Sequence, residues 1–557
     1  MTEHEHAEMT CVSGPPLQDG TRYASILDVI DSAARRYARH PAFSCMGHML
    51  SYAELDRLSR RFAAWLAHET TLKPGDRFAI LLPNVLQYPV AVFGALRAGL
   101  VLVNTNPLYT VDEMHHQFED AGVKGVLAFA HMADKLEKVL ARKHIEHVII
   151  TEIADLHALP GRWFYNLGAK YLKRLVPRHR LAHAVPFRTT LQRERDLSAI
   201  PRRHDDDLAV LQYTGGTTGT PKGAMLTHRN LIANMLQTGQ VLEGVLNKGR
   251  ETIIAPLPVY HIYTFTVNCM FACETGNHSV LIPDPRDLDG FVKTLRKYRF
   301  SAFIGLNTLF AALTRRADFR ALDFSHLRLS ISGGMALNEA IARRWEETTG
   351  CAILEGYGMT ETSPVVCVSP PGDLRPGYIG KPVADTMLKV IDDDGNALGI
   401  GEAGELCVRG PQVMLGYWQR PDETARTLSS DGWIRSGDMA VIERDGFVRI
   451  VDRKKDMIIV SGFNVYPSEV EEVLLSHPDV NEAAVIGIPD DDSGEAVKAY
   501  IVARNEALDE DTLRAWCKER LAGYKRPRFI EFRTELPKSN VGKVLRRELR
   551  DEARASS

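Results

Sequence analysis

A short glycine- and threonine-rich segment carries the clearest sign of chemistry in this sequence. Residues 213–223 read Tyr-Thr-Gly-Gly-Thr-Thr-Gly-Thr-Pro-Lys-Gly. Glycines let backbone N–H groups approach a polyphosphate closely, threonines add hydroxyl donors, and Lys222 adds a cation for phosphate oxygens. The segment is not a Walker A loop, because Pro221 and Gly223 flank the lysine and prevent a helix from beginning there in the usual way. A flexible linker is the alternative, but a linker needs neither a Pro-Lys-Gly stop nor apolar runs on both sides.

Two later segments could handle the rest of a nucleotide. Residues 355–362 read Glu-Gly-Tyr-Gly-Met-Thr-Glu-Thr and follow an apolar run. Tyr357 offers a flat face for a base, Thr360 a hydroxyl, and Glu361 a hard oxygen ligand suited to Mg²⁺. The alternative is a turn after a buried strand, with Glu361 merely solvated.

The second of these segments is residues 432–438, which read Gly-Trp-Ile-Arg-Ser-Gly-Asp. An aspartate after a tight Ser-Gly turn is placed to accept both hydroxyls of a ribose. In isolation, a hairpin aspartate that caps its own turn is the better interpretation of Asp438.

These segments together resemble the motifs of the adenylate-forming enzymes, which include acyl-CoA synthetases, luciferases and peptide-synthetase adenylation domains. The motifs occur in the family's order and cover the chain from about residue 50 to the C-terminus. The resemblance implies ATP and Mg²⁺ as cofactors, coenzyme A as a substrate, and Glu361 as the metal ligand. It assigns nucleotide binding to Tyr213, Thr214, Gly215, Gly216, Thr217, Thr218, Gly219, Lys222, Gly356, Tyr357, Gly358, Thr360, Asp438 and Arg453.

The resemblance also implies a moving C-terminal part. In residues 452–467, Arg453 matches a ribose-contacting arginine, Lys455 the hinge position, and Gly462 a glycine loop along the thiol path. Lys454 is better explained as part of a solvated linker. Lys543 matches the family's C-terminal catalytic lysine, acting with Thr214 and Glu361. A basic surface loop is the expectation for Lys538, Arg546 and Arg547.

An apolar segment with one histidine predicts the wall of an acyl pocket. Residues 256–265 read Pro-Leu-Pro-Val-Tyr-His-Ile-Tyr-Thr-Phe. A lone histidine on such a face is more often a satisfied core residue than a catalyst, and the resemblance makes His261 a pocket wall rather than a base. Tyr263 and Phe265 are candidate gate residues at the mouth of a tunnel. Small residues would leave the pocket floor open at Gly305, Gly333 and Gly334.

Composition bounds the class of protein. The 557 residues are 45% hydrophobic and 25% charged, with a formal net charge of -3, which is ordinary for a soluble globular chain and too long for one core. The near-neutral balance argues against a nucleic-acid partner. Of the eight cysteines only Cys269 and Cys273 are close, so free buried thiols in a reducing cytosol are expected. The polar start predicts no secretory signal, and the interrupted run Tyr88–Val103 predicts a buried helix and strand.

The elements that must position these residues follow from the pattern along the chain. Helical patterns alternate with apolar runs over residues 51–150 and 207–370, the α/β signature, and residues 380–450 change to short strands with Gly/Asp turns. We therefore expect an α/β fold with a large domain of two α/β subdomains plus a β-rich subdomain, and a small mobile α+β C-terminal domain. The expected bounds are 1–20 for a disordered N-terminus, 21–452 for the AMP-binding domain, 453–456 for the hinge and 457–557 for the small domain.

The segment Gly161–Val176 bears on the substrate. Trp163, Leu167, Tyr171 and Leu175 recur every four residues among interspersed lysines and arginines. Such a basic amphipathic helix predicts contact with a membrane surface, and a basic helix packed on the protein body has equal weight as the alternative. The insertion resembles that of bacterial long-chain fatty acyl-CoA synthetases.

The expected function is long-chain fatty acid–CoA ligation in the cytoplasm, with peripheral contact on the inner membrane surface and a dimer as the assembly. The partners are fatty acid, ATP and CoA, with no nucleic acid. Three alternatives stay open: a medium-chain or aryl acid–CoA ligase, an acyl-AMP ligase that loads a carrier protein, and an inactive fatty-acid-binding relative. Thioester formation with CoA and release of pyrophosphate discriminate among them.

Overall fold

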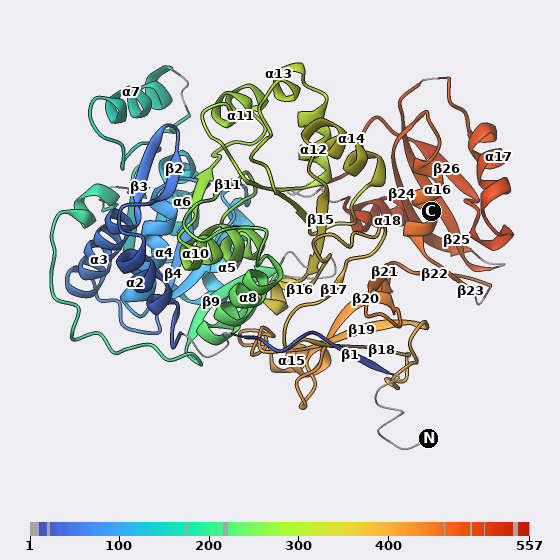
Figure 1. Cartoon of the computed structure of the whole chain (residues 1–557), viewed down its shortest axis with the longest axis horizontal. Helices are drawn as coiled ribbons and strands as arrows, with labels where there is room; N and C mark the ends of the chain where they lie inside the picture. Colours follow the sequence, from blue (N-terminus) through green and yellow to red (C-terminus); the bar gives the residue numbers. More distant parts are fainter. Residues whose placement is uncertain are drawn as a thin grey trace.

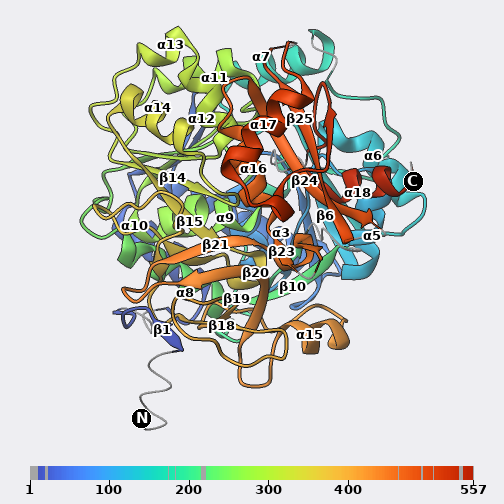
Figure 2. The ribbon, with the colours of Figure 1, turned by 90° about the vertical axis from the view of Figure 1, so that its right-hand side faces the viewer.

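The computed structural model describes residues 10–18, 23–172, 175–181, 183–214, 221–461, 463–490, 493–505, 507–538 and 544–555. In this part of the chain the strands form three sheets in a large domain and a fourth in a small C-terminal domain (Figure 1). The small domain lies at one end of the longest axis of the molecule, and Figure 2 views the molecule from that end. The predicted α/β class, with two α/β subdomains, a β-rich subdomain and a small α+β domain, is confirmed.

The first sheet is parallel except for one hairpin at its edge. Its order is β10-β9-β5-β4-β6-β7-β8, and only β9 and β10 pair antiparallel. Both faces of the sheet are covered, which explains why β4 and β5 are continuous apolar runs. The strands are Arg77–Leu81 (β4), Val101–Asn104 (β5), Val123–Phe129 (β6), His147–Thr151 (β7), Val185–Pro186 (β8), Leu208–Thr214 (β9) and Lys222–Thr227 (β10). The helices in this part of the chain are Ile26–Arg36 (α2), Tyr52–Glu69 (α3), Gln87–Arg97 (α4), Val111–Ala121 (α5), Ala133–Leu140 (α6), Gly161–Leu167 (α7) and His228–Val241 (α8).

The second sheet has a parallel centre and antiparallel edges, in the order β17-β16-β15-β14-β13-β11-β12-β2-β3. Its strands are Pro41–Cys45 (β2), His48–Ser51 (β3), Thr252–Ala255 (β11), His278–Leu281 (β12), Ala302–Gly305 (β13), Leu329–Gly333 (β14), Ile353–Gly358 (β15), Val365–Val368 (β16) and Lys381–Pro382 (β17). The accompanying helices are Ile262–Thr264 (α9), a π-helix at Phe265–Phe271 (η4), Ala272–Thr275 (α10), Leu288–Leu295 (α11), Asn307–Thr314 (α12), Ala317–Arg320 (α13) and Glu339–Thr349 (α14). The chain therefore enters this sheet at β2 and β3, leaves it to build the first sheet, and returns at β11.

The third sheet is the predicted β-rich subdomain, and it corrects one expectation. It is antiparallel in the order β1-β18-β19-β20-β21. Its strands are Cys11–Ser13 (β1), Met387–Ile391 (β18), Ala403–Arg409 (β19), Ile434–Ile442 (β20) and Val448–Arg453 (β21), and Pro421–Thr427 forms helix α15. Disorder over residues 1–20 is wrong for residues 10–18, because β1 pairs with β18 and Gly14 donates a backbone hydrogen bond to Thr386. Residues 1–9, 19 and 20 lie outside the described part.

The small domain carries a sheet in the order β23-β22-β25-β24, with β26 added beside β25. Its strands are Ile458–Val460 (β22), Phe463–Val465 (β23), Val480–Asp490 (β24), Gly494–Ala503 (β25) and Phe529–Phe532 (β26). Its helices are Pro467–Leu475 (α16), Glu510–Arg520 (α17) and Arg546–Ala555 (α18).

Packing divides the chain into two bodies. One apolar cluster joins all three sheets of the large domain, for example through Phe43, Phe78 and Leu388. Separate clusters fill the small domain, one around Val470 and another around Leu549. A small domain with its own core can change its position without opening the core of the large one.

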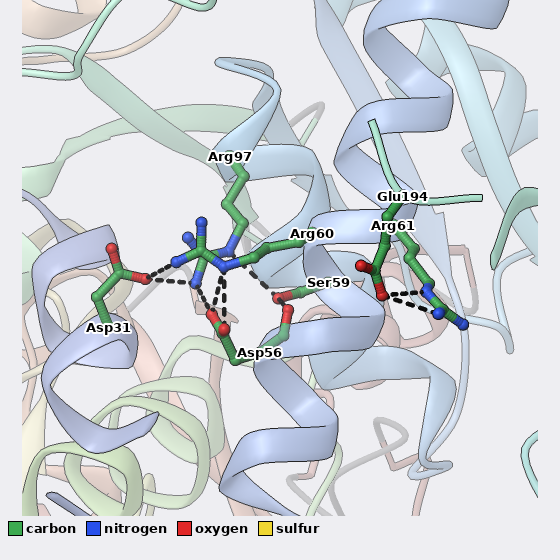
Figure 3. A network of polar contacts seen from close by, with 7 residues as sticks. All are labelled: Asp31, Asp56, Ser59, Arg60, Arg61, Arg97 and Glu194. Carbon is green, nitrogen blue, oxygen red and sulfur yellow. Dashed lines mark hydrogen bonds and ion pairs between the residues drawn. The ribbon is translucent and has the colours of Figure 1, made fainter. Parts of the chain in front are cut away.

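A network of charges around the buried Arg97 ties together the helices α2, α3 and α4 (Figure 3). Every residue of α4 is buried, including Arg97 near its C-terminal end. The Arg97 guanidinium lies 2.6 Å from carboxylate oxygens of both Asp31 on α2 and Asp56 on α3. Arg60 binds the same two carboxylates, at 3.0 and 2.9 Å. Two cations and two anions therefore neutralise each other in the network, as a buried charge requires.

Candidate active site

Most of the residues predicted from the motifs line a single cavity of about 970 Å³. Its walls come from the ends of β9, β14 and β15, from the start of β10, from the third sheet, and from Lys538 and Leu545 of the small domain. The predicted residues that line it are Tyr213, Thr214, Lys222, His261, Tyr263, Gly333, Gly334, Gly356, Tyr357, Gly358, Thr360, Glu361 and Arg453. Gly215, Gly216, Thr217, Thr218, Gly219, Gly462 and Lys543 lie outside the residues that the structure describes.

The predicted phosphate-binding segment, residues 213–223, connects β9 to β10 at the edge of the first sheet. Thr214 at the end of β9 and Lys222 at the start of β10 are paired in register, so the segment begins and ends at one point of the cavity wall. The Tyr213 hydroxyl donates to Asp120 at 2.6 Å, and Arg420 from the third-sheet subdomain binds the same carboxylate at 2.6 Å. Burial, together with the bond to Asp120, raises the pKa of Tyr213. Tyr213 therefore anchors the hairpin through its hydroxyl.

Lys222 has two partners from the third-sheet subdomain. It forms an ion pair with Glu423 on α15, and its ammonium lies 5.0 Å from the centre of the Tyr417 ring. The ion pair with Lys222 lowers the pKa of Glu423. A lysine held at the cavity wall by a single carboxylate can exchange that partner for a phosphate.

The predicted metal ligand is buried and oriented. Glu361 lies in a 3₁₀ turn at Thr360–Thr362, shortly after β15. Within the described part of the chain, its side chain accepts one hydrogen bond, donated by the Tyr417 hydroxyl at 2.7 Å. In the described part of the chain, no group of three or more His, Cys, Asp or Glu side chains could hold a metal ion. A lone carboxylate fits Mg²⁺, which takes one or two protein carboxylates and completes its shell with substrate phosphates and water.

Asp438 lies between two residues of the cavity wall. The Tyr357 hydroxyl donates to one of its carboxylate oxygens at 2.5 Å, and the Arg453 guanidinium contacts the other at 2.7 Å. Asp438 and Arg453 are cross-strand partners on β20 and β21. The turn expected before Asp438 is instead a bulge within β20, where Gly437 takes φ 71° and the pairing register to β19 shifts. Burial, and then the nearby Asp438 carboxylate, raise the pKa of Tyr357.

Only some of the residues predicted for the acyl pocket line the cavity. His261 and Tyr263 line the cavity, and Gly334 leaves open space at φ 84°. A Cβ on Gly333 would come within 3.3 Å of the Tyr263 ring, so this glycine accommodates the tyrosine. Phe265 is fully buried in η4, and neither it nor Gly305 lines the described cavity.

The structure explains in a different way why position 305 is a glycine. A Cβ on it would lie 2.6 Å from the ring of Phe310, which packs against Trp345 with ring centroids 4.6 Å apart. The glycine therefore makes room for a core aromatic ring and does not open a pocket floor.

An apolar arm of the cavity has no motif in the sequence. Its lining comes from α8 and the residue after it, from α9 and η4, from the strands β14 and β16, and from the loop after β11, which meet only in the fold: Thr238, Val241, Leu242, Leu257, Thr264, Val267, Ile331, Val365 and Val368. The apolar periodicity of α8 was the available signal, but it does not say which ligand the helix faces. Polar residues also line the cavity, among them Asn104, Asn106, Tyr109, Glu113, Gln212 and Tyr260.

The expected hinge is bound to both bodies. Lys454 was expected to be solvated, but its ammonium contacts Asp393 at 2.9 Å and Glu405 at 3.1 Å, both in the large domain. Asp456, two residues on, is bound by Arg550 of α18 at 2.8 Å. Lys455 is the residue between these two anchors.

Arg546 corrects a second expectation about basic residues. It was expected in a surface loop, but it begins α18 and lies 2.6 Å from Glu471 and 3.3 Å from Asp456, with its side chain largely buried. Lys538 does pair near the surface with Glu482, at 2.6 Å, and also lines the cavity.

The basic segment near residue 161 is a projecting element (Figure 1). It forms α7 and then a π-helix at Gly168–Leu172 (η2), and Lys173 and Arg174 lie outside the described residues. Phe164 is 76% exposed and Leu172 is 85% exposed, so the apolar side chains are not packed on the body. No helix in the described ranges, α7 included, combines the length and apolarity needed to cross a membrane.

Comparison with known proteins agrees with this geometry. The chain is 51% identical over 535 residues to the long-chain-fatty-acid–CoA ligase of Salmonella typhimurium, covering 96% of this chain and 95% of that one. It is 36% identical over 535 residues to the long-chain-fatty-acid–CoA ligase of Bacillus subtilis, covering 95% and 94%. The crystal structure of the anthranilate–CoA ligase AuaEII in complex with anthranoyl-AMP superposes with a TM-score of 0.84 at 26% identity, over 96% of this chain and 98% of that one.

Two family models match in sequence order. The model of the AMP-binding enzyme covers residues 30–418, and the model of the AMP-binding enzyme C-terminal domain covers residues 469–543. The chain belongs to the AMP-binding enzyme family.

Proposed function

We propose that this chain is an AMP-forming long-chain fatty acid–CoA ligase. The observation that carries the proposal is one cavity lined by the apolar arm and by the charged residues Lys222, Glu361 and Arg453, here called its polar end. A fatty acid has the matching shape, an alkyl chain with a carboxylate at one end. The relatives of about half identity are named long-chain-fatty-acid–CoA ligases, which supports the same activity here.

Positioning explains the first half-reaction. With the alkyl chain between α8 and η4, the fatty carboxylate reaches the polar end, where the phosphates of ATP meet Lys222 and the hairpin segment. A carboxylate oxygen attacks the α-phosphorus, the bond to the β-phosphate oxygen breaks, and pyrophosphate leaves with acyl-AMP behind. Holding two anions in line and neutralising the developing charge accounts for the rate gain, and no nucleophilic side chain is needed.

Glu361 would hold the metal in this step, and bound Mg²⁺ supplies neutralisation of phosphate charge. Tyr357 would stack on the adenine, and Asp438 would accept the ribose hydroxyls. The Asp438 carboxylate is held in place for this role by its contacts with Tyr357 and Arg453.

The second half-reaction needs the thiol of CoA at the acyl carbon. The sulfur attacks that carbon, its proton passes to solvent, and AMP leaves with the oxygen that came from the carboxylate. We assign the path of the thiol to the loop around Gly462 and the adenylation step to Lys543, on the strength of the motif match. The small domain must then present different faces in turn.

The experiment that tests the function is a substrate series with the purified chain. Hexanoate, laurate, palmitate, oleate and 4-coumarate are each supplied with ATP, Mg²⁺ and CoA, and acyl-CoA and AMP are quantified. The proposal predicts the highest kcat/KM for palmitate or oleate. A preference for hexanoate or 4-coumarate would contradict the long-chain assignment. Acyl-AMP without thioester would point to a carrier-loading ligase, and no pyrophosphate would point to an inactive binding protein.

We further propose that the element α7–η2 contacts the cytoplasmic face of the membrane, from which a fatty acid would arrive. Its exposed apolar side chains and interspersed lysines and arginines support this placement, since both kinds of contact strengthen interfacial binding. A homodimer stays a prediction that sedimentation analysis would test.

A further inference from the structure

A segment that no motif singled out connects to the charged residues of the cavity. Residues 414–420 run along the free edge of β10, with backbone hydrogen bonds from Met225 to Gly416 at 2.9 Å and from Trp418 to Gly223 at 2.8 Å. The segment thus extends the edge of the first sheet, although it belongs to the β-rich subdomain. Gly416 takes φ 141°, and a Cβ there would lie 2.6 Å from Thr424, so the chain can make this turn only with glycine.

Tyr417 lies at the centre of this segment and meets two cavity residues of opposite charge. Its hydroxyl donates to Oε1 of Glu361 at 2.7 Å, and its ring lies under the Lys222 ammonium at 5.0 Å. The backbone of the same segment also contacts residue 361, because the Met414 N–H donates to the Glu361 carbonyl at 2.8 Å. Tyr417 is 7% exposed and Glu361 is 8% exposed, so water does not replace this hydrogen bond easily.

We propose that Tyr417 is a positioning residue that orients the Glu361 carboxylate for Mg²⁺ and holds Lys222 beside it. The inference rests on the proposed function in that Glu361 is taken as the metal ligand. A carboxylate of this burial needs a donor, and one bond to Oε1 fixes its rotation while lone pairs on both oxygens remain for a metal. The ring beneath Lys222 keeps the cation near the same point, as expected for cation–π contact. Metal and phosphate would then arrive at a preformed pair.

Binding of ATP to the purified full chain, measured by calorimetry in EDTA and in increasing Mg²⁺, tests the proposal. Tyr417→Phe removes only the hydroxyl. We expect its affinity for ATP in EDTA to stay within about twofold of wild type, whereas the tightening by Mg²⁺ falls roughly tenfold, the scale of a hydrogen bond to a charged group. An unchanged response to Mg²⁺ would overturn the proposal.

Tyr378→Phe is the matched control, because the Tyr378 hydroxyl also bonds a glutamate, Glu443, at 3.2 Å but lies outside the cavity wall. It should leave the response to Mg²⁺ unchanged. A double-mutant cycle with Glu361→Gln adds a second criterion: if Tyr417 acts through Glu361, Tyr417→Phe has no further effect in that background. A full additional loss there would show that Tyr417 acts independently.

Thermal unfolding of each variant separates misfolding from lost positioning. Should Tyr417→Phe not fold, Tyr417→Met, which also lacks the hydroxyl and packs adaptably, must show the weaker response to Mg²⁺, or the proposal fails. Palmitoyl-CoA formation by the wild type is measured in parallel. Its absence would defeat the proposed function, while the ATP and Mg²⁺ titrations would still decide the role of Tyr417.

Discussion

In the proposed mechanism, the chemistry depends most on Glu361. Its carboxylate lines the cavity and accepts a hydrogen bond from the Tyr417 hydroxyl. Glu361→Ala should abolish adenylation and leave the fold intact, because the lost bond costs stability of only about 1–3 kcal/mol. ATP–pyrophosphate exchange in the presence of palmitate measures the loss.

The matched control is Glu443→Ala, which removes another Tyr–Glu hydrogen bond outside the cavity wall. It should lose a similar stability and keep its exchange activity. Near-normal exchange by Glu361→Ala would show that the carboxylate is not the metal ligand.

The role of some site residues could be predicted from the sequence, and that of others could not. Glu361 and Asp438 occur in local strings, so a motif finds them without a structure. Tyr417 and Asp120 act through partners far along the chain, for example across the 300 residues between Asp120 and Arg420, and no local pattern reports such a contact. Arg546 was misjudged for the same reason: a basic string looks solvated until the carboxylates facing it are known.

The element α7–η2 is unusual in having its apolar side chains outside. An amphipathic helix of a globular protein normally buries that face, whereas Trp163 here is 63% exposed. The sequence predicted the amphipathic pattern but could not decide between packing and exposure, because both use the same periodicity. It also could not predict that the helix changes to a π-helix at Gly168.

Removing the charges of Lys170, Lys173 and Arg174 should weaken binding to anionic vesicles, by roughly 1 kcal/mol for each charge. Replacing Phe164 and Leu172 with serine should weaken it further, since both lose the apolar area that would enter the interface. Co-sedimentation with vesicles at low salt gives the result. Serine at Phe529 and Phe532, which are 43% and 39% exposed on the small domain, is the control and should change nothing. Equal binding by all variants would contradict membrane contact through this element.

The expected hinge, residues 453–456, predicts which of the two half-reactions a substitution impairs. Lys454 is held by the large domain and Asp456 by α18, so a rotation between the bodies falls on Lys455. Lys455→Pro should allow acyl-AMP formation and slow the thioester step, because proline fixes φ at that residue. Lys543→Ala should do the reverse and still convert supplied acyl-AMP and CoA.

The two half-reactions, assayed separately, measure these effects. Lys455→Ala is the control for the proline variant, since it removes the charge and keeps the freedom of φ, and both of its half-reactions should persist. Equal loss of both half-reactions in Lys455→Pro and Lys543→Ala would contradict a two-state hinge.

At the scale of the whole molecule, the sequence pattern predicted the fold class but not the order in which the strands pair. Alternating helices and apolar runs gave two α/β subdomains, and Gly/Asp turns gave the third sheet. The pairing of β2 with β12 and of β1 with β18 was not predictable, because strand order depends on contacts between distant segments. The cavity lies where these segments meet, and for that reason its apolar arm had no signal in the sequence.

The central claim is that one cavity activates a fatty acid as its adenylate before the thiol arrives. Palmitate labelled with ¹⁸O in its carboxylate, supplied with ATP, Mg²⁺ and CoA, tests this claim most directly. Mass spectrometry of the products should find a single labelled oxygen in AMP and none in pyrophosphate, because the oxygen that attacks the α-phosphorus leaves with AMP. Label in pyrophosphate or phosphate, or formation of ADP in place of AMP, would contradict the account.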